Sequence, residues 1–128
     1  MNCLLDTCTF VWLCAEPERL SPRAKAAING GSGSLALSQI SILEISLKWA
    51  AGKIILPQPP RVWIETQTNL WQLNVIPIAD DDIYRMTELP RVHLDPFDRL
   101  LVATAINRRF SLLTPDEWLH QYPVHCVW

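Results

Sequence analysis

The sequence predicts an α/β domain of three layers, in which helices cover both faces of a short central parallel sheet. Short apolar segments with strand character alternate along the chain with longer segments of helical character. This alternation is typical of parallel sheets built from strand–helix–strand units. The chain has 128 residues, of which 49% are hydrophobic and 19% charged, a balance that favours a buried core over disorder. Residues 1–128 are therefore predicted to form a single domain.

Local signals define the elements of the first half. Ser21 and Pro22 mark one helix start, because serine is a favourable N-cap and proline suits the first helical position. The segment 40–51 is apolar on most sides and is expected to form a largely buried helix. In chain order we predict a strand over 3–5, helices over 9–15 and 21–28, a strand over 34–37, and helices over 40–51 and 60–73.

Aspartate residues mark the helix starts of the second half. Asp95 is predicted to cap a helix whose first residue is Pro96, and Asp80 can cap the helix before it. The segment around Leu112 is short, apolar and followed by polar residues, as expected for a buried strand. In chain order we predict a strand over 75–78, helices over 80–89 and 95–108, and strands over 111–113 and 124–127.

Four acidic side chains fall where predicted strands end or where the following helices begin. Asp6 and Asp116 follow strands, whereas Glu44 and Asp98 lie near the first turns of helices. Ligands of such sheets bind beyond the carboxyl ends of the strands, so the four carboxylates are expected to converge there. Gathered carboxylates repel one another, and a hard cation such as Mg²⁺ or Mn²⁺ relieves that repulsion. Such an ion also activates water for attack on a phosphodiester, so the pattern predicts a nuclease.

Several of these acids also have local roles that the sequence leaves open. Glu44 stands three residues after Ser41, as in a capping box, and four before Lys48, as in a helical ion pair. Asp95 is expected to act mainly as a helix cap. Asp6 has no obvious capping role, which makes it the strongest site candidate. Roles at helix ends also remain open for Asp98 and Asp116.

The remaining residues predict no second site. A net charge of −2 argues against binding nucleic acid through positive charge alone. The four cysteines form no C-x-x-C pair and are expected to be reduced thiols of a cytosolic protein. No apolar run approaches membrane-spanning length, so a soluble, cytoplasmic protein is expected. Histidines without metal-site spacing are interpreted as structural or surface residues: His93, His120 and His125.

The tryptophans favour a contact surface for another protein. Trp63 and Trp71 lie eight residues apart on one predicted helix. Aromatic side chains stack on nucleobases in some proteins. They are more often buried or placed in protein interfaces, and we interpret these two as interface residues.

Four stretches occur in a characteristic order and together span nearly the whole chain. The most specific contains the run Asp-Pro-Phe-Asp-Arg-Leu-Leu. The stretches are Leu4–Thr7, Ser41–Lys48, His93–Ala103 and Leu113–Asp116. In these motifs the chain resembles PIN-domain ribonucleases, especially the VapC-type toxins of toxin–antitoxin pairs. It departs from the commoner pattern at Pro115, where a basic or polar residue is usual.

The resemblance implies an endoribonuclease that depends on Mg²⁺ or Mn²⁺, forms a homodimer, cleaves RNA and is blocked by a cognate antitoxin. It implies supporting hydroxyl groups at Thr7 and Thr114. Catalytic and metal-binding roles are implied for Asp6, Glu44, Asp98 and Asp116.

Two other functions compete with an RNA nuclease. A DNA nuclease would use the same fold and metal, and the sequence separates the two substrates poorly. A non-catalytic interaction module is a different class, and retention of four acids argues against it. A phosphoacceptor module would need a lysine after a late strand, and no lysine follows Lys53.

Overall fold

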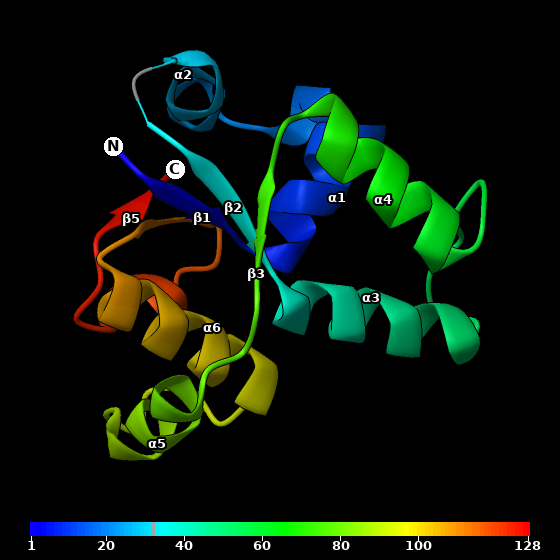
Figure 1. The fold of residues 1–128 in the computed structure, drawn as a ribbon. Helices are drawn as coiled ribbons and strands as arrows, with labels where there is room; N and C mark the ends of the chain where they lie inside the picture. Colours follow the sequence, from blue (N-terminus) through cyan, green and yellow to red (C-terminus); the bar gives the residue numbers. More distant parts are fainter. Residues whose placement is uncertain (32) are drawn as a thin grey trace.

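The computed structural model describes residues 1–31 and 33–128 as five strands and six α-helices, with two short 3₁₀ segments (Figure 1). The first half contains β1 (Cys3–Leu5), α1 (Thr7–Ala15), η1 (Pro17–Arg19), α2 (Pro22–Asn29), β2 (Leu35–Ser38), α3 (Gln39–Ala50) and α4 (Pro60–Leu70). The second half contains β3 (Asn74–Ile76), α5 (Asp80–Glu88), α6 (Pro96–Arg108), β4 (Ser111–Leu113), η2 (Leu119–Gln121) and β5 (Cys126–Val127).

The strands form one parallel sheet in the order β3-β2-β1-β4-β5. The chain builds outward from β1 through β2 to β3 and then returns to place β4 on the other side of β1. The direction of winding therefore reverses between β1 and β4, and ligand sites of open α/β sheets form at this reversal. A bond from the Asp6 N–H to the carbonyl of Leu113, 3.0 Å long, joins the ends of these two strands.

Side chains alternate across the sheet and enter two separate cores, as a parallel sheet covered on both faces requires. Leu5 packs with side chains of α1, α2 and α4 on one face. Leu4 packs with side chains of α5 and α6 on the other. The three-layer arrangement expected from the sequence is confirmed, with α1, α2 and α4 opposite α5 and α6 (Figure 1).

Most element positions agree with the sequence-based expectations, and the differences lie at the ends. The first helix begins at Thr7 rather than 9, because the Asp6 carboxylate caps it. The helix α4 ends at Leu70, three residues early, and β3 is shifted toward the N-terminus. The expected cap Asp80 is instead the first residue of α5, and a different carboxylate, that of Asp82, accepts from the N–H of Ala79.

Two expectations about apolar side chains were wrong. Trp63 is only 4% exposed and packs edge-on against Phe10 in the core, so it cannot belong to an interface. The helix α3 is not largely buried. It leaves the end of β2 and runs away from the sheet beside α4 (Figure 1), which exposes Leu43, Leu47 and Trp49. Among residues 1–31 and 33–128, none of the helices combines the length and the apolar character that a membrane span requires.

Candidate functional site

A cavity of about 400 Å³ opens where β1 ends, and all four predicted carboxylates line its wall. Asp6 follows β1 and Asp116 follows β4, while Glu44 comes from α3 and Asp98 from α6. The wall also contains apolar side chains and one lysine. The other lining residues are Thr7, Cys8, Val11, Trp12, Ile45, Lys48, Ile54 and Asp95.

Asp6 is the most constrained of the four carboxylates and is only 6% exposed. Its Oδ1 accepts a hydrogen bond of 2.7 Å from the N–H of Thr7, which makes it the N-cap of α1. Its Oδ2 accepts from the hydroxyl of Thr114 at 2.6 Å and from the thiol of Cys8 at 3.6 Å. The expectation that Asp6 has no capping role was therefore wrong, and the same carboxylate both caps a helix and lines the cavity.

Thr114 links Asp6 to Asp116 across the two central strands. Its fully buried hydroxyl donates to Asp6 and accepts from the N–H of Asp116 at 3.1 Å. The Oδ1 of Asp116 accepts from the N–H of Trp118 at 2.9 Å, a bond that orders the turn before η2. Pro115 thus does not displace Asp116 from the cavity wall.

Glu44 is held by Lys48, four residues later on α3, with 2.8 Å between Oε2 and Nζ. The capping-box alternative is wrong because Ser38 caps this helix. Ser41 instead accepts a bond of 2.9 Å from the hydroxyl of Thr7. Lys48 therefore brings a positive charge to a cavity wall whose other charged side chains are acidic.

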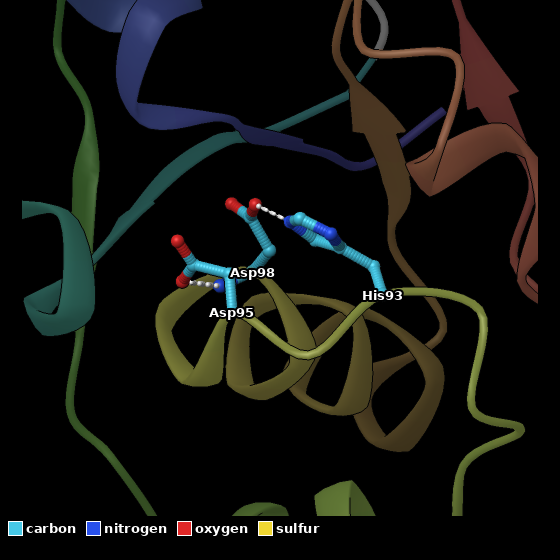
Figure 2. Close-up of side chains that lie close together, drawn as sticks. All are labelled: His93, Asp95 and Asp98. Carbon is cyan, nitrogen blue, oxygen red and sulfur yellow. Dashed lines mark hydrogen bonds and ion pairs between the residues drawn. The ribbon is translucent and has the colours of Figure 1, made fainter.

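The start of α6 gathers Asp95, Asp98 and His93, as Figure 2 shows. Asp95 caps the helix as expected, since its Oδ1 accepts from the N–H groups of Phe97 and Asp98. Nε2 of His93 lies 2.9 Å from Oδ2 of Asp98. One potential ligand atom from each of the three side chains lies within 4.8 Å of the others, so this group is compact enough to contact one ion.

Motif spacing gave no indication of the contact between His93 and Asp98, because His93 was interpreted as a structural or surface residue. Its contact with Asp98 depends on the loop before α6 folding back over the first helical turn. A signal for it does exist in the sequence. A histidine shortly before an Asp-Pro helix start can reach the side chain at the third helical position, which is Asp98 here.

The cavity disfavours the ionised form of two of its carboxyl groups, those of Asp6 and Asp98. Burial raises the pKa of Asp6, and the nearby Glu44 adds to that effect. Burial, together with the charges of Asp6 and Asp95, raises the pKa of Asp98 to about 7, against a lowering effect of the His93 hydrogen bond. Burial also raises the pKa of the Cys8 thiol to about 12, which leaves this cysteine protonated and a poor nucleophile. A divalent cation such as Mg²⁺ or Mn²⁺ would favour the ionised form of these carboxyl groups and prefers oxygen ligands, so the cavity suits such an ion.

Metal binding is expected to compete with protons at Asp98. At pH 6 this carboxyl group, with its pKa of about 7, is mostly protonated, and Mg²⁺ affinity should be about tenfold lower than at pH 8. Isothermal titration of the protein with Mg²⁺ at both pH values measures this difference. The Asp98→Asn variant should bind more weakly and lose most of the pH dependence. Equal wild-type affinities at pH 6 and pH 8 would contradict the expectation.

Protonation of Asp98 also sets the direction in which the stability of the metal-free protein changes with pH. The pKa of Asp98 is raised on folding, so its protonated form favours the folded state. That contribution is lost as pH rises from about 4 through about 7. In EDTA the protein should therefore melt at a higher temperature at pH 6 than at pH 8, and saturating Mg²⁺ should remove the difference.

The fold is a three-layer α/β domain with an acidic cavity at the ends of its central strands, and the chain belongs to the PIN-domain family. The family model described as PIN domain matches residues 3–124. One relative, Ribonuclease VapC22 of Mycobacterium tuberculosis, is 32% identical over 124 residues, which cover 94% of this chain and 92% of that protein.

Solved structures share the fold at lower sequence identity. A chain in the crystal structure of VapBC2 from Rickettsia felis, bound to a DNA fragment from their promoter, matches with a TM-score of 0.74 and 16% identity over 98% of this chain and 97% of that chain. A chain in the structure of VapBC-5 from Mycobacterium tuberculosis, a member of the VapBC family of toxin–antitoxin systems, matches with a TM-score of 0.62 and 16% identity. That alignment covers 98% of this chain and 94% of that one.

Proposed function

We propose that this protein is a divalent-metal-dependent endoribonuclease and the toxin of a toxin–antitoxin pair. The observation that carries the proposal is the convergence of Asp6, Glu44, Asp98 and Asp116 on one cavity at the reversal point of a PIN-domain sheet. The relative that is named a ribonuclease supports RNA as the substrate. The four free cysteines fit a location in the reducing cytoplasm.

In this proposal the four carboxylates bind Mg²⁺ or Mn²⁺. A bound ion would polarise a phosphoryl oxygen and lower the pKa of a water molecule. The chain orients its ligands through its own contacts. Thr114 fixes one oxygen of Asp6 and the backbone of Asp116, and Lys48 restrains Glu44. Lys48 also offers a charge that can attract an RNA phosphate to the cavity.

Incubation of the purified protein with labelled RNA tests the proposal. Internal cleavage should occur with Mg²⁺ or Mn²⁺ and should stop when EDTA is added. A single-stranded DNA of the same sequence is the matched substrate and should remain intact. Cleavage of DNA at an equal rate would favour the alternative of a DNA nuclease. Absence of cleavage in either metal, with an intact fold by circular dichroism, would refute a nuclease.

An antitoxin is the expected protein partner, and the cavity indicates how it could inhibit. The fork of an arginine side chain can bond two carboxylates at once and would compete with the metal. We expect a complex with the antitoxin to place a basic side chain between carboxylates of the cavity. An inhibited complex whose cavity lacks such a side chain would contradict this mode of inhibition.

A homodimer is also proposed, with a contact surface different from the one first expected. Because Trp63 is buried, the exposed apolar side chains of α3, centred on Leu47, are the better candidates. Sedimentation at tens of micromolar, an ordinary interface affinity, should show a dimer. Leu47→Asp should shift the protein to a monomer, whereas Ile55→Asp, at an exposed apolar position outside α3, should not. A wild-type monomer would contradict the proposal.

A further inference from the structure

We infer that His93 is a positioning residue, which holds one oxygen of Asp98 and leaves the other to bind the ion. The inference rests on the proposed metal-dependent function and extends it to a side chain outside the four carboxylates. Its starting observation is the bond of 2.9 Å between Nε2 of His93 and Oδ2 of Asp98. Figure 2 shows that the second oxygen of Asp98 lies on the side away from the imidazole.

A frame of three residues surrounds His93. The ring of Trp118 stacks nearly parallel to that of His93, with 6.3 Å between the centroids and an angle of 14°. The hydroxyl of Tyr122 accepts from the N–H of His93 at 3.0 Å and donates to its carbonyl at 2.9 Å. A third group, the buried guanidinium of Arg99, donates to the same carbonyl at 3.2 Å. The ring of His93 thus has an aromatic neighbour besides Asp98, and its backbone has two hydrogen-bonding partners.

This frame decides the orientation of Asp98. When Asp98 is ionised, its carboxylate can only accept hydrogen bonds, and Nε2 of His93 then donates to it. That bond keeps Oδ2 occupied and prevents free rotation of the carboxylate. The remaining oxygen then faces a ligand with its direction already set. Supporting hydrogen bonds of this kind commonly change metal affinity by about 10–100-fold.

Trp118 connects the same frame to a second carboxylate of the cavity, that of Asp116. Its backbone N–H bonds to Oδ1 of Asp116 while its ring stacks on His93. The residues that follow β4 therefore support two carboxylates at once, one directly and one through the imidazole. A histidine with only a packing role would not need Nε2 on a carboxylate of the cavity.

Two substitutions separate the hydrogen bond from the packing. His93→Phe keeps an aromatic ring against Trp118 but removes the donor. His93→Gln can return an N–H close to the position of Nε2. The matched control is His125→Phe, because His125 bonds to Ser111 through Nδ1 and does not line the cavity. Mn²⁺ binding is measured by electron paramagnetic resonance, and thermal melts in EDTA report the metal-free fold.

His93→Phe should weaken Mn²⁺ binding about 10–100-fold with little change of the melting temperature in EDTA. His93→Gln should recover affinity to within about threefold of wild type, and His125→Phe should bind Mn²⁺ like wild type. Wild-type affinity in His93→Phe would overturn the inference. So would a loss of affinity that His93→Gln fails to recover, because the donor would then not be the cause.

A direct role of His93 as a metal ligand is the other outcome to test. Electron spin echo measurements on the Mn²⁺ complex detect nitrogen bonded to the ion. We expect no directly coordinated histidine nitrogen, and finding one that His93→Phe removes would overturn the positioning role. Failure of the proposed function can be distinguished from failure of this inference. Wild-type protein that neither binds Mn²⁺ nor cuts RNA would refute the nuclease. An active wild type with an unaffected His93→Phe variant would refute only the role of His93.

Discussion

The Asp6→Asn variant is expected to lose RNA cleavage by about 10³-fold or more and to remain folded. Metal ions contribute several kcal/mol to stabilisation of the transition state, and each 1.36 kcal/mol is about a tenfold change in rate. Removing one negative charge from the cavity weakens the proposed ion site directly. Rates of cleavage of a labelled RNA with Mg²⁺, for the variant and for wild type, measure the loss.

The metal-free variant should be at least as stable as wild type. Asparagine is as good an N-cap as aspartate, so its side-chain oxygen can still accept from the N–H of Thr7. The hydroxyl of Thr114, which donates to Asp6 in wild type, can turn and accept from the new amide group instead, because a hydroxyl both donates and accepts. Burial raises the pKa of Asp6, which means that its charge opposes folding at neutral pH. Asparagine removes that charge and the repulsion from Glu44. Thermal melts should therefore show no decrease in EDTA and a smaller increase with added Mg²⁺.

Asp82→Asn is the matched control, because Asp82 is another buried carboxylate, only 1% exposed, that does not line the cavity. Its two oxygens accept from the N–H of Ala79 and from the side-chain amide of Asn107. The new amide group cannot accept both bonds, so this variant should lose about 1–3 kcal/mol of stability and keep its Mg²⁺ response. If Asp6→Asn behaved in the same way, Asp6 would be purely structural. Cleavage by Asp6→Asn at the wild-type rate would remove the strongest support for the carboxylate site.

Replacing Arg99 should lower the free energy of unfolding more than any other substitution described above. Arg99 is 9% exposed, and the bonds of its guanidinium within the described residues go to carbonyls and a hydroxyl rather than to a carboxylate. Two nitrogens of one side chain thereby tie the end of α5 to the loop before α6. The acceptors are the carbonyls of Met86, Leu89, Pro90 and His93 and the hydroxyl of Tyr122.

Arg99→Met should lower the free energy of unfolding by about 4 kcal/mol, because charged hydrogen bonds are lost and buried carbonyls are left without donors. Arg99→Lys keeps the charge but cannot span both sets of carbonyls, so it should lose about half as much. Arg91→Met, at an exposed position in the same loop, should change stability by less than about 0.5 kcal/mol. Urea denaturation measures all three, and equal stability of Arg99→Met and Arg91→Met would contradict the role of the guanidinium.

Much of the fold follows from local signals that tertiary contacts did not override. The side chains of the short strand Cys3–Leu5 are apolar, and Asp95-Pro96 is a strong signal for a helix start. Both elements therefore lie where the sequence predicts them. The position of helix α3 relative to the sheet could not be predicted. Its apolar composition suits burial, but its direction after β2 leaves Leu47 52% exposed, and a surface meant for another chain has the same composition as a core.

The candidate site was predictable where it depends on topology and not where it depends on side-chain geometry. The rule that ligands bind beyond parallel strands placed Asp6 and Asp116 together correctly. It carries no information on which hydroxyl bonds to Asp6, or on the loop that brings His93 to Asp98. Those contacts depend on rotamers and loop conformation, which a pattern of residue types does not specify.

The sheet order has a consequence for synthesis of the protein on the ribosome. Asp6 is made among the first residues, but its partner Thr114 lies 108 positions later, and β4 must insert beside β1 before the two can meet. A growing chain therefore carries four of the five carboxylates that line the cavity without the segment that completes their arrangement. The order of translation itself delays completion of the acidic cavity until residues through Asp116 have emerged.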